Sequence, residues 1–140
     1  MHIMGYKLYS AERLINDIQS LPADRLLEWQ NKRKWDIAKY HHEKNYLYRS
    51  KINGKFPNTW EDLPILCKSD YQSDFVKILS NGYSLKNIYR ANTSGSSGHP
   101  FFYAKNKYAH AITWALTKNR YAWHNIGIES KQARYFGSPL

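Results

Sequence analysis

The sequence predicts an α+β arrangement in which a helical region, residues 1–86, precedes a strand-bearing region, residues 87–140. In the first region, apolar residues recur at helical spacing. In the second region, residues 87–92 alternate apolar and polar side chains, and residues 101–104 form a short aromatic run. Both patterns are typical of strands. A Ser/Gly-rich stretch separates these two runs, and residues 105–124 then return to a helical pattern. Strands next to each other in sequence with a short connection predict an antiparallel pair.

Two helices are expected before residue 53. The first begins near Ser10, and its apolar side consists of Leu14, Ile15 and Ile18. Pro22 suits the first position of a second helix, because its missing N–H needs no partner there. That helix is expected from about Ala23 to Ser50, with one face buried. The residues expected on this face are Leu26, Trp29, Ile37, Tyr40 and Leu47.

A third helix is expected from Ser69 or Asp70, either of which can cap it, to about Leu79. Asn81-Gly82 marks its end. Residues 133–137 resemble a strand that enters a turn.

The chain of 140 residues carries a net charge of +10, from 21 Lys and Arg against 11 Asp and Glu. Such a balance raises nucleic acid as a partner. The excess is spread over both ends of the chain, however, and the densest run, Lys32-Arg33-Lys34, is followed at once by Trp35 and Asp36. A solvated basic surface is therefore favoured over a nucleic-acid track. No apolar run has the length of a membrane helix, and no secretory signal is evident, so a cytoplasmic protein is expected.

No residue predicts acid–base, nucleophilic or metal chemistry. His41 and His42 are adjacent on a predicted helix, so their side chains diverge by about 100° and chelate poorly. Cys67 is the single cysteine and lacks a neighbouring base, which favours a role as a small buried apolar residue. The sequence therefore predicts neither a catalytic residue nor a metal site.

The Ser/Gly-rich stretch is the one segment with a chemical signature. It runs Thr93-Ser94-Gly95-Ser96-Ser97-Gly98-His99-Pro100. A flexible linker is one interpretation. A phosphate-binding loop is the other, because glycines let the backbone approach an anion while successive N–H groups and small hydroxyls donate to it. The short length and the flanking strands favour the phosphate-binding loop.

This stretch resembles the Ser/Thr/Gly-rich nucleotide loop of the adenylate-forming (acyl-CoA synthetase) superfamily. Three further segments resemble the phenylacetate–CoA ligase branch and its relatives described as capsular polysaccharide biosynthesis proteins. They are Tyr46-x-Tyr48-Arg49, the run Trp60-Glu-Asp-Leu63-Pro-Ile-Leu-Cys67-Lys68-Ser-Asp70, and Tyr135-Phe136-Gly137. The segments occur in family order and cover roughly residues 29–140. The position after the loop proline, where many members have Lys, is Phe101.

The resemblance implies an α/β fold for a longer enzyme, with residues 87–140 as the beginning of its nucleotide-binding subdomain. It implies an AMP-forming ligase that activates a carboxylate with ATP and Mg²⁺ as an acyl-adenylate and transfers the acyl group to CoA or another acceptor. The loop residues 93–99 would bind the β- and γ-phosphates, and Tyr135, Phe136 and Gly137 would border the acyl pocket. The adenine, magnesium and catalytic lysine sites would lie beyond Leu140, so this chain is expected to be an N-terminal part, inactive alone. A basic, helical nucleic-acid-binding module with a Ser/Gly linker is the alternative.

Overall fold

The computed structural model describes residues 6–133 except 53, 73, 94, 96–99, 128 and 132. Over these residues the chain combines helices with a two-stranded antiparallel sheet, so the predicted α+β composition is confirmed. In chain order the elements are α1 (Leu8–Gln19), α2 (Ala23–Lys44), α3 (Tyr46–Ser50), the 3-10 helix η1 (Lys68–Tyr71), β1 (Ile88–Asn92), β2 (Phe102–Asn106) and α4 (Lys107–Ala122).

The core lies where α1 packs against α4. Ala11 and Ile15 of α1 meet Ala111 and Ala115 of α4, and all four are buried. Because three of these side chains are single methyl groups, the two helix backbones can approach closely. At the edge of the contact Lys118 Nζ lies 2.8 Å from a Glu12 carboxylate oxygen. The first helix of the predicted N-terminal region therefore shares a core with the last described helix.

The two strands form the hairpin that the alternation of residues 87–92 and 101–104 predicts. Ile88 pairs with Asn106 and Asn92 with Phe102 in antiparallel register. β2 runs two residues further than expected, so α4 begins at Lys107 instead of residue 105. Asn106 sets this boundary, because its side-chain oxygen accepts the Ala109 N–H at 2.7 Å and thereby caps α4.

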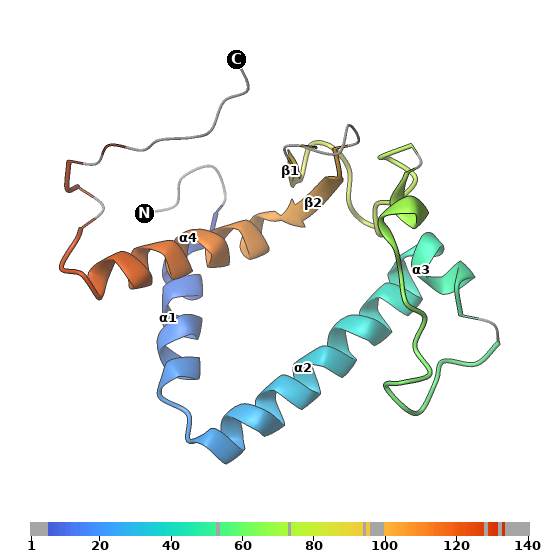
Figure 1. Ribbon diagram of the computed structural model, residues 1–140, viewed down its shortest axis with the longest axis horizontal. Helices are drawn as coiled ribbons and strands as arrows, with labels where there is room; N and C mark the ends of the chain where they lie inside the picture. The colour runs from blue at the N-terminus through green and yellow to red at the C-terminus, as the bar shows by residue number, and fades with distance from the viewer. Residues whose placement is uncertain are drawn as a thin grey trace.

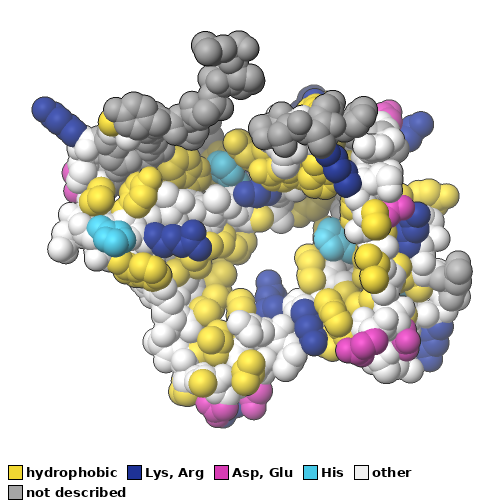
Figure 2. All heavy atoms as spheres, viewed as in Figure 1, with side chains coloured by type: hydrophobic (Ala, Val, Ile, Leu, Met, Phe, Trp, Pro, Cys, Tyr) yellow, Lys and Arg dark blue, Asp and Glu magenta, His cyan; other side chains and the backbone are white. Residues whose placement is uncertain are grey.

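The predicted buried face of α2 is confirmed only in part. Ala38 is the buried residue of α2, Ile37 is 51% exposed, and Leu26, Trp29 and Tyr40 are only half-buried. Figure 1 shows the reason: α1, α2 and the line of hairpin and α4 form the three sides of a triangle, so no helix lies along the middle of α2. The space-filling view shows an opening through this triangle (Figure 2).

α2 also ends earlier than expected. Asn45 has an extended backbone that breaks the helix, and its side-chain oxygen accepts the Tyr48 N–H at 2.9 Å, which starts α3. A helix that spans the membrane is not found in the described part of the chain, because none combines sufficient length with sufficient apolar character.

The helix expected from Ser69 or Asp70 to Leu79 is also wrong. Among the described residues of this segment, the single turn η1 is helical, and turns follow at residues 75–78 and 81–82. Backbone bonds within the segment are confined to isolated turns, such as Lys77 N–H to Asp74 O at 2.9 Å. Two further bonds tie the segment to the end of α2: Asn45 Nδ2 donates to Ile78 O at 2.9 Å, and Asn81 N–H donates to Lys44 O at 2.7 Å. Cys67, expected to be buried, is exposed beside η1.

Candidate functional site

The candidate phosphate loop connects the two paired strands. Its base is closed by Thr93 and Phe101, which share two hydrogen bonds of 3.0 Å: Thr93 N–H donates to Phe101 O, and Phe101 N–H donates to Thr93 Oγ1. The Asn92 side-chain amide also donates to Thr93 O at 3.0 Å. The hairpin therefore fixes both ends of the loop, as a preorganised anion site requires.

Gly95 has the left-handed backbone that the glycine-rich sequence predicts, with φ of +68°. A Cβ at this position would lie 2.9 Å from Pro100 N and 3.0 Å from Pro100 Cα. Two separate constraints therefore require glycine at position 95: the positive φ angle and the close approach of the two sides of the loop. Of the predicted phosphate-binding residues, Thr93 and Gly95 are brought together at this base.

The other predicted site residues lie outside the described residues. They are Ser94, Ser96, Ser97, Gly98 and His99 of the loop, together with Tyr135, Phe136 and Gly137 of the expected acyl-pocket border.

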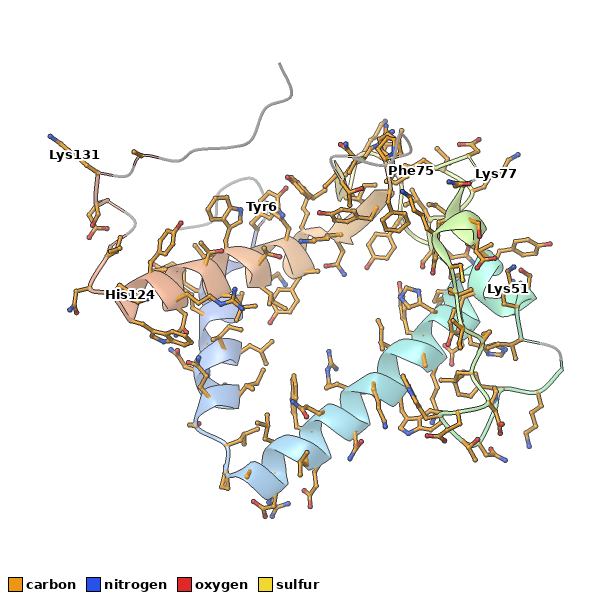
Figure 3. All side chains as sticks on the ribbon, in the orientation of Figure 1. Tyr6, Lys51, Phe75, Lys77, His124 and Lys131 are labelled. Atoms are coloured by element: carbon orange, nitrogen blue, oxygen red, sulfur yellow. The ribbon has the colours of Figure 1, made fainter. Side chains whose placement is uncertain are left out.

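Arg90 is a candidate that sequence reasoning missed. It lies on β1 three residues before Thr93, and its guanidinium carbon is 4.7 Å from the Phe75 ring centre and 4.8 Å from that of Phe102. Figure 3 shows Phe75 beside the hairpin. With the described residues Arg90 makes no hydrogen bond or ion pair, and two rings lie against its guanidinium group. The sequence signal that could have identified Arg90 is a positively charged residue in a strand that leads into a Ser/Gly-rich loop.

A second cluster joins α2 to the segment that precedes the hairpin. Asn45 is its centre: the amide Nδ2 donates to Ile78 O and, at 3.2 Å, to Ser80 Oγ. Ser80 Oγ lies 3.4 Å from His41 Nδ1. His42 lies elsewhere, with its ring 5.1 Å from that of Phe56, so the two adjacent histidines diverge as helical geometry predicts.

The surroundings of two histidines lower their pKa. Burial lowers the pKa of His41 below its usual range. Burial, together with the charge of Lys105, lowers the pKa of His110 on α4. The His110 ring stacks on Tyr89 at 3.8 Å, and its Nε2 accepts the Trp114 indole N–H at 3.0 Å. Nδ1 then carries the proton of the neutral ring, and it is buried without a partner among the described residues.

These shifts predict that the free energy of unfolding falls as the pH is lowered from about 8 to about 5. The sign follows from the lowered pKa: the unfolded chain, whose histidines titrate near about 6.5, binds protons that the folded chain resists. His110→Phe keeps a ring beside Tyr89 and removes one titrating group. The free energy of unfolding should therefore depend less steeply on pH in this variant. Urea unfolding at a series of pH values measures this slope.

The matched control for that series is His124→Phe, because His124 is exposed and lies at the far end of α4 (Figure 3). This variant should keep the slope of the parent chain. An unchanged slope in His110→Phe would show that His110 does not contribute to the pH dependence.

Three or more His, Cys, Asp or Glu side chains do not gather into a cation site anywhere in the ranges that the structure describes. Compared with known proteins, the chain matches no family model, no curated protein and no solved structure.

Proposed function

We propose that residues 93–100 hold the polyphosphate of ATP, and that the chain is the N-terminal part of an AMP-forming ligase of the phenylacetate–CoA ligase-like type. The observation that carries the proposal is the placement of Thr-Ser-Gly-Ser-Ser-Gly-x-Pro on the connection of an antiparallel hairpin. A linker between domains has no need of a closed base, whereas a loop that must present donors to an anion gains from one.

In the proposed reaction a carboxylate oxygen attacks the α-phosphorus of ATP. The bond from that phosphorus to the bridging oxygen breaks, which gives an acyl-adenylate and pyrophosphate. The loop contributes by stabilising the charge that develops on the departing pyrophosphate, through backbone N–H groups and hydroxyls. Thr93 and Gly95 fix the loop, and Arg90 supplies a nearby positive charge. Mg²⁺ enters with ATP, and CoA is one candidate acceptor for the acyl group.

The test is a titration of the ¹⁵N-labelled chain, followed by amide chemical shifts, with Mg-ATP, inorganic tripolyphosphate and AMP. Mg-ATP and tripolyphosphate should shift the amide signals of Thr93, Gly95 and Phe101, because the loop recognises the outer phosphates. AMP lacks these phosphates and should leave the signals unchanged.

Two outcomes would contradict the proposal. One is an equal response to AMP and ATP. The other is a response spread over the lysine and arginine residues of α2 that double-stranded DNA reproduces and that salt weakens steeply, which is the behaviour of a nucleic-acid-binding surface.

A further inference from the structure

A cavity of about 500 Å³ lies between the C-terminal half of α2, the segment 66–83 and β2. This volume is within the range of about 300–1,000 Å³ that is typical of small-molecule sites. Phe and Tyr are eight of the 20 described lining residues, among them Tyr40, Tyr48, Tyr71, Phe75, Tyr83 and Phe102. Such walls favour a flat, apolar ligand that can stack on them.

The hydrogen bonds around Asn45 connect His41 to Ser80. Asn45 Oδ1 accepts the Tyr48 N–H, so its Nδ2 is the group that donates to Ser80 Oγ. Within the described residues the Ser80 hydroxyl proton then has one acceptor, His41 Nδ1 at 3.4 Å. A Ser80 hydroxyl that donates to Nδ1 leaves the proton of the neutral His41 ring on Nε2. Burial lowers the pKa of His41, which keeps the ring neutral at pH 7.

The Nε2–H of His41 has no hydrogen-bond partner in the described part of the chain, although His41 lines the cavity. Two other polar side chains of the wall each donate one N–H to a protein atom and keep at least one more. Asn106 donates to Tyr83 OH at 3.2 Å and caps α4 with its oxygen, and Lys105 Nζ bonds to Thr113 Oγ1 at 3.1 Å. The tyrosine hydroxyls can donate or accept, so they do not select between ligands. The imidazole N–H can only donate, and it selects an acceptor.

The charges at the cavity disfavour a cation. Lys105 is the charged residue of the described lining, and no Asp or Glu belongs to that lining. Three of the lining rings already have a cation against them: Arg90 lies against Phe75 and Phe102, and Lys105 Nζ is 5.7 Å from the centre of the Tyr103 ring.

We infer that this cavity binds an uncharged, planar aromatic molecule that carries a hydrogen-bond acceptor, such as a ring nitrogen or a carbonyl oxygen, to which His41 Nε2–H donates. Ser80 and Asn45 are positioning residues, because they act on the ligand only through His41. This site does not depend on the phosphate-binding loop, so each can fail without the other.

Three probes of the same shape test the inference at about pH 7.5: naphthalene, quinoline and N-methylquinolinium. Quinoline adds an acceptor to the naphthalene shape, and N-methylquinolinium replaces that acceptor with a positive charge. Because a hydrogen bond to a neutral donor contributes about 0.5–1.5 kcal/mol, quinoline should bind about two- to tenfold more tightly than naphthalene. N-methylquinolinium should bind more weakly than quinoline. Amide chemical shifts at the cavity residues give the three dissociation constants.

His41→Phe keeps a ring in the wall and removes the donor, so the preference for quinoline over naphthalene should disappear while naphthalene still binds. His42→Phe is the matched control, because His42 packs on Phe56 and does not line the cavity, and it should keep the preference. Equal affinity for quinoline and naphthalene in the parent chain would overturn the inference, and so would a preference that survives His41→Phe or tighter binding of N-methylquinolinium.

A measurement on the parent chain covers the case in which His41→Phe fails to fold. The ¹⁵N spectrum of the histidine side chains should show His41 with its proton on Nε2, and Ser80→Ala should mix the two neutral forms. Addition of quinoline should shift the Nε2 signal, whereas naphthalene should not. A parent His41 protonated on Nδ1 would contradict the assignment.

Discussion

Asn45→Ala is expected to lower the free energy of unfolding by about 2–4 kcal/mol. The substitution removes the cap of α3, which contributes about 1 kcal/mol. It also leaves the Ile78 carbonyl and Ser80, which is buried, without the amide that bonds to them, at a cost of about 1–3 kcal/mol. Urea unfolding monitored by far-UV circular dichroism measures the loss.

Asn106→Ala is the matched control for this prediction. Asn106 also caps a helix and also donates an amide hydrogen bond, but it is exposed. Its replacement should therefore cost about 1 kcal/mol, the cap contribution alone. Equal losses for the two variants would show that burial of the Asn45 cluster adds nothing to stability.

Gly95→Val should weaken the binding of Mg-ATP at least about tenfold while the hairpin remains folded, a loss of about 1.4 kcal/mol or more. Any side chain at this position must adopt a positive φ and place its Cβ 2.9 Å from Pro100 N, so the two sides of the loop have to separate. The amide titration with Mg-ATP gives the affinity, and the signals of β1 and β2 show whether the hairpin persists.

Gly54→Val separates the two effects of the valine. Gly54 has a φ of +89°, so valine there meets the same backbone strain, but its Cβ would have no atom within 4 Å. This variant should bind Mg-ATP as the parent chain does. If Gly95→Val also retained the parent affinity, the assignment of the loop to phosphate would be wrong.

Elements whose structure depends on residues close in the sequence could be predicted. The hairpin follows from the alternation of residues 87–92 and the aromatic run 101–104 around a glycine-rich turn. α4 follows from its helical periodicity, and its exact start depends on the cap that Asn106 provides.

Features that depend on distant residues could not be predicted. The sequence predicts a helix from Ser69 or Asp70 to about Leu79, yet the 33-residue separation of Asn45 and Ile78 hides the hydrogen bond that draws this segment to α2. The cavity could not be predicted for the same reason. Its wall combines residues from α2 to α4, and no local sequence pattern indicates that these residues come together. The exposed face of α2 likewise follows from the open triangle, a property of the whole arrangement.

In the triangular arrangement, a small rotation of α2 about one end produces a large displacement of its other end. With 22 residues α2 is about 33 Å long. One end adjoins α1 through the short connection at residues 20–22, and the other carries Tyr40 and His41 into the cavity wall. A rotation of about 5° at the connection displaces the far end by about 3 Å, nearly the thickness of an aromatic ring. Such a rotation would change the separation between Tyr40 and His41 and the β2 side of the cavity, which the Asn45 hydrogen bonds do not tie to α2. We therefore expect Pro22→Gly, at the opposite corner of the molecule, to alter the binding of aromatic rings without touching them.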